Sequence, residues 1–232
     1  AKYLWNSLKV TFLYSMGEIL VTMVGGMLLA LLFNRMTRSF GLMRAFVFVP
    51  KYVAMSSAAV VFLWILNTDS GVLNYLLQCI GLPAVDWLNQ QSTALPSVLM
   101  LTGWRVIGYG MMIYLSAMMG ISQEYYEAAS LDGANGVQKF FRITLPLLSP
   151  TTLFLLVTTF LSSMKVFQSV DILTSGGPAR STEVFVYLIY RYAMVDFRMD
   201  RAATAAVMFF LILLVITVLT MKVSDRSVTY DS

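Results

Sequence analysis

The chain has 232 residues, of which 58% are hydrophobic and 12% charged, with no histidine and one cysteine. A soluble domain carries about twice that share of charged residues, so we expect a protein embedded in a membrane. The net charge of +4 is spread without a basic stripe, so no nucleic-acid partner is expected. The single Cys79 excludes an intrachain disulfide, and the lack of histidine argues against a transition-metal site.

Five stretches are apolar enough and long enough to cross a bilayer, which takes about 20 residues per helix. We therefore expect an all-α, polytopic membrane protein that forms one transmembrane domain over residues 1–232. The predicted spans are Leu8–Phe33, Met43–Leu66, Leu95–Met119, Leu147–Val170 and Ala202–Val223.

The connection between the first two spans is rich in arginine, whereas residues 67–91 hold no lysine or arginine. Because cationic residues gather on the cytoplasmic side of spans, the first connection is predicted to be cytoplasmic. Over all connections, however, seven cationic residues fall on that side and six on the other. Charge alone therefore sets the orientation only weakly.

Apart from cations at the span ends, four charged side chains fall within the predicted spans, at Glu18, Lys51, Arg105 and Lys165. Such groups are costly in lipid and usually face a cavity or a partner. Glu18 and Arg105 lie near the middle of their spans, so we expect both to face a cavity. Lys51 follows Arg44 by about 10 Å of helix, and its long side chain is expected to reach the cytoplasmic headgroups instead.

The connection between the third and fourth spans, residues 120–146, is polar and has helical signals. Ser122 can cap a first helix, and Gly133 can end it. Asn135 and Gln138 can begin a second, short helix, because each side chain can satisfy the backbone N–H of the other residue. The segment is predicted to form a helix, a turn and a helix.

The same segment has the pattern Glu127-Ala128-Ala129, three residues, Gly133, nine residues and Ile143-Thr144-Leu145-Pro146. This pattern resembles the "EAA" coupling motif in the membrane subunits of ATP-binding-cassette importers. The resemblance implies that the 120–146 loop faces the cytoplasm and docks into a cleft of the ATPase subunit. It assigns the ATPase contact to Glu127, Ala128, Ala129, Asp132, Gly133, Ile143, Leu145 and Pro146.

Three further stretches resemble the sugar-type permeases of this importer class, which include the larger maltose-permease subunit and the glycerol-phosphate permease. They are Asn6-Ser7-Leu8, Trp64-Ile65-Leu66 followed by Gly71-Val72-Leu73-Asn74, and Leu173-Thr174-Ser175-Gly176-Gly177-Pro178. The resemblance implies a type I importer transmembrane domain with a cytoplasmic coupling loop. In that topology Ala1 lies outside, and we expect a sixth, N-terminal span to precede it.

The resemblance also implies the partners of the chain. It would pair with a second, homologous permease subunit in the bacterial cytoplasmic (inner) membrane, together with a homodimeric ATPase and an extracytoplasmic solute-binding protein. The chain has no Gly-x-x-x-x-Gly-Lys-Ser/Thr phosphate loop, so ATP and Mg²⁺ are expected on the ATPase and no cofactor on this chain. We expect that the chain is not itself an enzyme.

The resemblance and the charges inside the spans predict a path for a sugar or an oligosaccharide, which would cross by alternating access. The candidates for the substrate path are Arg105, Tyr109, Lys165 and Glu18. The turn predicted to contact the binding protein is Gly176, Gly177 and Pro178, because glycine tolerates positive φ and proline fixes the chain after it.

Two alternatives remain open at this point. Lys51, Arg105 and Lys165 outnumber Glu18, which would suit an importer of an anionic solute such as a glycerol phosphodiester or a uronate oligosaccharide. The other alternative is a membrane-embedded enzyme or an ATP-independent channel. An intramembrane enzyme needs acids, nucleophiles or metal ligands that converge at depth, and Glu18 is the only carboxylate placed deep in a predicted span.

Overall fold

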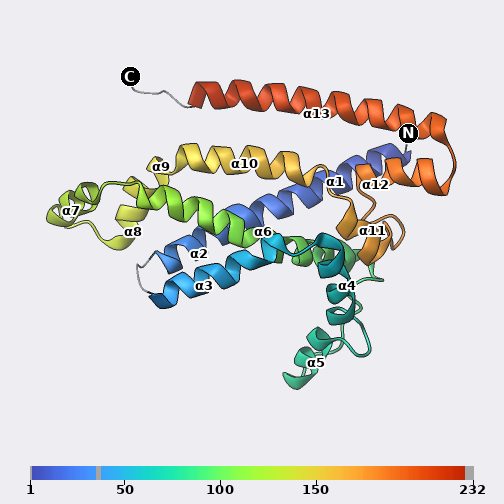
Figure 1. The fold of residues 1–232 in the computed structure, drawn as a ribbon, viewed down its shortest axis with the longest axis horizontal. Coiled ribbons are helices and arrows are strands. Elements are labelled where there is room, and N and C mark those ends of the chain that lie inside the picture. Colours follow the sequence, from blue (N-terminus) through green and yellow to red (C-terminus); the bar gives the residue numbers. More distant parts are fainter. Residues whose placement is uncertain (1, 35–37, 228–232) are drawn as a thin grey trace.

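The computed structural model describes residues 2–34 and 38–227, and the regular structure of these residues is entirely helical. Three helices are long and apolar enough to cross a membrane alone, and two bent pairs of helices qualify if each pair counts as one span. This agrees with the five spans predicted from the sequence. The long helices lie side by side along the long axis of the molecule (Figure 1).

The first span is a continuous run of α1 (Lys2–Leu20), a π-helical turn η1 (Val21–Gly25) and α2 (Gly26–Phe33). It packs along α6 (Gln91–Met119), the third span. Glycine makes this a contact between backbones, because a Cβ on Gly26 would lie 2.8 Å from the backbone carbon of Gly110. A larger residue at this crossing would push the two helices apart.

The second span is broken, so the prediction of one continuous helix over Met43–Leu66 is wrong. α3 (Arg38–Phe48) leads into a 3₁₀ turn η2 (Val49–Tyr52), and α4 (Met55–Ile65) then leaves at a bend of 102°. Pro50 has no N–H with which to continue the helical ladder. The apolar composition continues through the break, but the helix does not.

The fourth span is also interrupted, and the prediction of a helix over Leu147–Val170 is correct only in its first part. α10 (Ser149–Ser163) is bent by 62° from the helical turns before it. α11 (Gln168–Thr174) then starts in a new direction and packs on α4. The break lets Val166 and Phe167 pack against the buried apolar cluster between α4, α6 and α11.

The last span is α13 (Met199–Ser227), which contains the predicted Ala202–Val223. Before it stand two short pieces that were not predicted, α12 (Phe185–Tyr190) and a π-helical turn η4 (Arg191–Val195). α12 packs between α1 and α13. Large exposed side chains cover the outer surfaces of the spans, as expected for helices that face lipid or another membrane subunit; they include Phe12, Leu20, Leu28, Phe46, Phe154 and Phe210.

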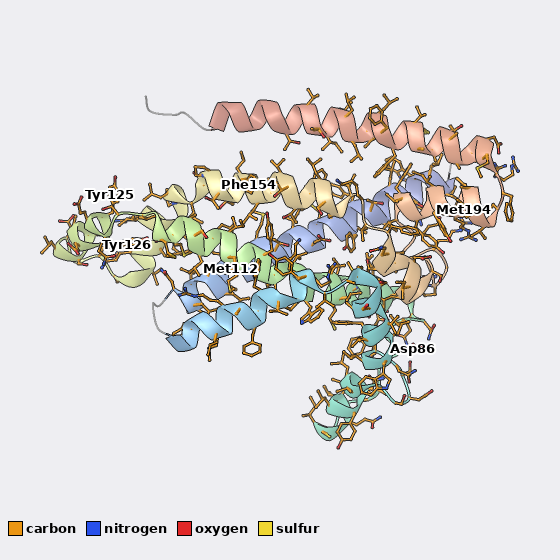
Figure 2. All side chains as sticks on the ribbon, viewed as in Figure 1. Asp86, Met112, Tyr125, Tyr126, Phe154 and Met194 are labelled. Atoms are coloured by element: carbon orange, nitrogen blue, oxygen red, sulfur yellow. The ribbon has the colours of Figure 1, made fainter. Side chains whose placement is uncertain are left out.

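The two ends of the molecule differ in structure. At one end lie α7 (Gln123–Leu131) and α8 (Gly136–Lys139), followed by a π-helical turn η3 (Phe140–Thr144) and α9 (Leu145–Leu147). At the other end lie α11 and α12, and α4 projects there with α5 (Val72–Cys79) as an arm (Figure 1). Figure 2 shows Tyr125 and Tyr126 at the first end, and Asp86 and Met194 toward the second.

Candidate functional site

The segment that resembles the coupling motif forms a helix, a turn and a second helix, as predicted. The side chain of Ser122 accepts the backbone N–H of Glu124 at 3.3 Å and so caps α7. Gly133 follows α7 with a φ of 76°, which favours glycine. Asn135 and Gln138 each accept the backbone N–H of the other at 2.9 Å and begin α8.

Two side-chain hydrogen bonds brace this segment. The hydroxyls of Tyr126 and Thr144 lie 2.9 Å apart, and Lys139 Nζ donates to Ser130 Oγ at 2.5 Å. Leu131 stands free beside them at 91% exposure, and a partner that covered it would remove most of its apolar surface from water. The sequence analysis missed Leu131, although it lies between the predicted contacts Ala129 and Asp132.

The residues predicted to contact the ATPase share one feature, which is accessibility. Ala129 and Ile143 are half-buried, and the exposed ones are Glu127, Ala128, Asp132, Gly133, Leu145 and Pro146. They therefore form a surface at one end of the molecule rather than a packed core.

All four predicted substrate-path residues line two cavities among the first four spans. Glu18, Arg105 and Lys165 line the larger cavity, of about 480 Å³. Glu18 and Tyr109 line the smaller one, of about 230 Å³. The two cavities adjoin, because Glu18 and Ser162 line both.

Lys51 also lines both cavities, so the prediction that it reaches the cytoplasmic headgroups is wrong. Its Nζ lies 4.7 Å from the centroid of the Tyr109 ring, a distance at which the ring attracts a cation. The prediction assumed a continuous helix, whereas Lys51 stands in the 3₁₀ turn of the broken second span. The available signal was Pro50, directly before it.

Arg105 holds the broken backbone of the second span. Its Nη2 donates to the carbonyl oxygen of Lys51 at 3.1 Å, and its Nη1 lies 3.5 Å from Met55 Sδ. A chain that leaves helical geometry inside a membrane frees carbonyl groups that lipid cannot satisfy. Arg105 satisfies one of them, which the sequence analysis did not anticipate.

Several buried polar atoms around the cavities make no hydrogen bond within the described residues. They include the hydroxyls of Tyr14 and Ser169 and the Nε of Arg105 beside the larger cavity, and the Thr22 hydroxyl beside the smaller one. Buried polar groups nearly always have a partner. The cavities are therefore surrounded by polar groups.

The predicted Gly-Gly-Pro turn belongs to a loop between α11 and α12, residues 175–183, which we call the outer loop. Gly176 has a φ of 75°, and a Cβ there would lie 2.7 Å from Tyr187 Cε1. Gly176 is buried, and Gly177 and Pro178 are half-buried. The exposed residues are the neighbouring Ser175 and Ala179, so glycine here sets the shape of the loop rather than its surface.

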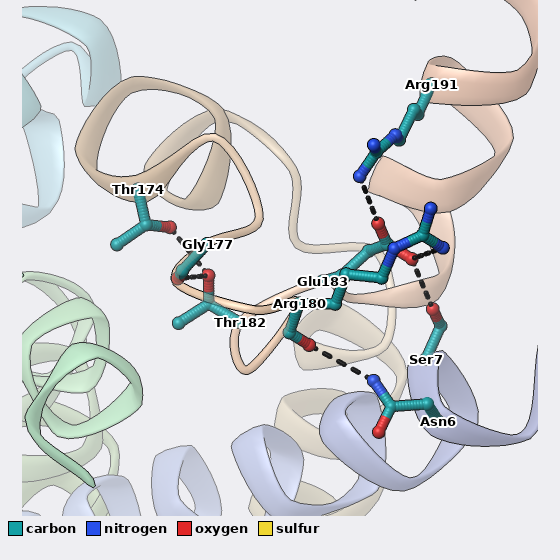
Figure 3. A network of polar contacts seen from close by, with 8 residues as sticks. All are labelled: Asn6, Ser7, Thr174, Gly177, Arg180, Thr182, Glu183 and Arg191. Atoms are coloured by element: carbon teal, nitrogen blue, oxygen red, sulfur yellow. Dashed lines mark hydrogen bonds and ion pairs between the residues drawn. The ribbon is translucent and has the colours of Figure 1, made fainter. Parts of the chain in front are cut away.

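A buried carboxylate ties the outer loop to the first span (Figure 3). Glu183 is 0% exposed. Its Oε1 accepts Ser7 Oγ at 3.2 Å and Arg180 Nη1 at 3.3 Å, and its Oε2 accepts Arg191 Nη1 at 3.0 Å. Asn6 Nδ2 donates to the Arg180 carbonyl oxygen at 3.1 Å. The sequence analysis missed this cluster, because Ser7 and Glu183 lie 176 residues apart in the chain.

Helical spans around a polar cavity, with a braced helix and turn at one end, define a membrane-embedded transport subunit. The chain belongs to the family of binding-protein-dependent transport system inner membrane components, which matches residues 22–230. It is therefore a permease subunit of an ATP-binding-cassette importer, and the predicted family and fold class are confirmed.

Relatives and solved structures agree with this assignment. The chain is 34% identical over 222 residues to the probable ABC transporter permease protein YurN of Bacillus subtilis, with 94% of this chain and 76% of that protein covered. It is 33% identical over 226 residues to the sn-glycerol-3-phosphate transport system permease protein UgpA of Agrobacterium fabrum, with 97% and 77% covered.

Among solved structures, the chain is similar to a bacterial ABC transporter involved in the import of the acidic polysaccharide alginate. The TM-score is 0.87 at 28% identity, over 97% of this chain and 80% of that chain. The bacterial alginate ABC transporter in complex with an alginate pentasaccharide-bound periplasmic protein matches with the same values.

Proposed function

We propose that the chain forms half of the translocation path for a sugar or an oligosaccharide, which crosses the bacterial inner membrane by alternating access. A second, homologous permease subunit forms the other half. Two copies of a separate ATPase bind ATP and Mg²⁺ and drive the cycle, and an external solute-binding protein delivers the solute. This chain itself hydrolyses no ATP.

The observation that carries the proposal is the connection between the coupling segment and the cavity walls. α6 contributes Arg105 to the larger cavity and ends at Met119, directly before the coupling segment. α10 contributes Ser162 to both cavities and begins directly after it. A partner that moves the coupling segment would therefore move two walls of the cavity.

The chemistry of the smaller cavity supports a sugar. Glu18 offers an acceptor, Lys51 a donor and Tyr109 an aromatic face, and Thr158 and Thr159 add hydroxyls from α10. Sugar hydroxyls both donate and accept hydrogen bonds, so they match such a mixed set of groups.

A second candidate solute is anionic, and one specific observation favours it. The larger cavity is lined by Lys51, Arg105 and Lys165 but by a single carboxylate, Glu18. Charged residues within membrane spans usually pair with one another, and an anionic solute would supply a partner for the surplus cations. The names of the UgpA relative and of the alginate transporter also refer to acidic solutes.

Uptake by the Lys165→Gln variant distinguishes a neutral sugar from an anionic solute. A neutral sugar needs a hydrogen-bond donor, which glutamine retains, so uptake per assembled importer should fall about threefold or less. An anion needs the charge, so uptake of an acidic solute should fall by about tenfold or more. The solute is first identified as the compound that raises the melting temperature of the cognate binding protein, and uptake is then measured in proteoliposomes.

Lys9→Gln is the matched control for this experiment, because Lys9 is exposed on α1 and does not line either cavity. It should transport like the wild type. If the assembled wild-type importer takes up no sugar and no acidic sugar derivative at all, the proposed function is wrong.

A further inference from the structure

The outer loop holds an unfavourable backbone conformation. Ser175, Ala179 and Arg180 have φ values of 47°, 46° and 62°. Residues other than glycine rarely adopt positive φ, and they keep it only where the surrounding contacts enforce it. The shape of this loop is therefore imposed by its contacts and is not the relaxed shape of a free loop.

Contacts inside the loop fix its curvature. The hydroxyls of Thr174 and Thr182 lie 2.7 Å apart, and the Thr182 hydroxyl donates to the Gly177 carbonyl oxygen at 2.7 Å. The backbone N–H of Ser181 donates to the Pro178 carbonyl oxygen at 2.9 Å. All of these bonds join the loop to itself or to the end of α11, so none of them fixes the loop against the first span.

Two contacts supply that attachment: the hydrogen bond from Asn6 Nδ2 to the Arg180 carbonyl oxygen, and the Glu183 cluster. The Glu183 carboxylate binds Ser7 of α1, Arg180 of the loop and Arg191 of η4 at once. Arg180 in turn lies 3.7 Å from the centroid of the Tyr3 ring, on α1. A carboxylate with no exposed surface is costly to bury unless it is paired. Glu183 and its partners therefore fix one another in position.

The outer loop lies at the end of the molecule opposite the coupling segment (Figure 1). Ala179 is exposed, whereas Glu183 and Ser7 are completely buried. A partner that touched the loop would therefore meet its outer side, and the Glu183 cluster would support that side from within.

From this arrangement we propose that Glu183 positions the outer loop for docking of the external binding protein. This inference rests on the proposed function and adds a positioning residue to it. A loop that is already held in its bound shape loses little conformational freedom on docking, so docking is tighter. Loss of the Glu183 carboxylate frees the loop and weakens docking, while the coupling segment and the ATPase sites stay intact.

The test uses the complete importer in lipid nanodiscs with its purified cognate binding protein. ATPase activity is measured while the concentration of the binding protein is raised. Glu183→Gln should increase the half-saturating concentration by about fivefold or more. The maximal rate should stay within about twofold of the wild type. A purely structural defect would lower the yield and the maximal rate and leave the half-saturating concentration unchanged.

Ser7→Ala provides a second variant that removes one hydrogen bond and leaves both arginines on Glu183. It should assemble normally and raise the half-saturating concentration by about twofold to fivefold. A readout independent of ATP is the protection of an Ala179→Cys probe from a maleimide by the binding protein, with Cys79 replaced by serine. Protection should need correspondingly more binding protein in the Ser7→Ala background.

Asp200→Asn is the matched control. It removes an exposed carboxylate whose pairing with Arg198, at 3.2 Å, contributes little, so its half-saturating concentration should equal that of the wild type. The proposal is overturned if Asp200→Asn has as large an effect as Glu183→Gln, or if Ser7→Ala changes neither readout. If the binding protein does not stimulate even the wild-type importer, the proposed function itself fails.

Discussion

Arg105 is bound to the backbone of its own chain before any solute enters the cavity. Its Nη2 donates to the Lys51 carbonyl oxygen at the break of the second span. The side chain of Lys165, by contrast, is exposed at the cavity and makes no hydrogen bond or ion pair within the described residues. Both cations were predicted to line the substrate path. In the structure both line the cavity, but only Arg105 also binds the backbone of the second span.

Arg105→Leu should therefore lower both the melting temperature and transport. The loss of a donor to a buried carbonyl costs about 1–3 kcal/mol. Lys165→Leu should lower uptake while the melting temperature stays that of the wild type. Thermal unfolding of the purified importer in detergent, followed by intrinsic fluorescence, measures the first effect, and uptake in proteoliposomes measures the second. Equal melting temperatures for the two variants would contradict this division.

At the level of residues, the sequence predicted which groups meet, but not how they are oriented. Glu18, Arg105 and Lys165 were selected because charged groups are costly in lipid, and Tyr109 because sugar rings bind aromatic faces and hydroxyls. All four do line adjoining cavities. Glu183 gave no such signal, because a carboxylate next to a turn normally lies in water. Its burial depends on partners that are distant in the sequence.

The helical elements divide into those with strong local signals and those without. The helices of the coupling segment carry N-caps and a terminating glycine, and they form as predicted. The breaks in the second and fourth spans have little signal in the hydropathy, because the chain is apolar on both sides, although Pro50 marks the first of them. They are set by packing of α4 and α11 against each other and on α6, which a hydropathy pattern cannot contain.

The coupling segment yields a prediction at this scale. Glu127→Lys reverses an exposed charge, and Leu131→Glu places a charge on the side chain that is 91% exposed. Neither change touches a packed core, so expression and insertion into the membrane should be normal. ATPase stimulation by the binding protein and solute uptake should both fall about tenfold or more, because a charge would be buried in the contact with the ATPase.

Leu82→Glu is the control, since Leu82 is also exposed, at 50%, but lies in the connection predicted to be outside. It should stay coupled. Wild-type stimulation in both Glu127→Lys and Leu131→Glu would remove this surface from the ATPase contact.

The whole molecule has its coupling segment and its outer loop at opposite ends (Figure 1). This arrangement agrees with the prediction that the two lie on opposite sides of the membrane, and the cytoplasmic side of the 120–146 loop stays a prediction. The margin in the charge count was small, with seven cationic residues on the cytoplasmic side and six on the other. The orientation therefore calls for a direct measurement.

Single-cysteine probes provide it, in a background where the exposed Cys79 is serine. An impermeant maleimide on intact spheroplasts should label Gln91→Cys and Ala179→Cys and should label Gly136→Cys only after lysis. All three positions are exposed, and a Cβ at Gly136 meets nothing within 4 Å, so the probes should not disturb the fold. If Gly136→Cys were the only variant labelled in intact spheroplasts, the topology would be the reverse of the predicted one.

The contact between Gly26 and Gly110 limits how this permease can change shape. Interlocked backbones cannot slide past each other without a large increase in separation, so the first span and α6 must turn as one body. α6 has 29 residues, or about 43 Å of helix, and it ends at the coupling segment. A tilt imposed at that end therefore becomes a displacement of opposite direction at the far end of the helix. Opening on one side of the membrane and closure on the other would then be two effects of a single rotation.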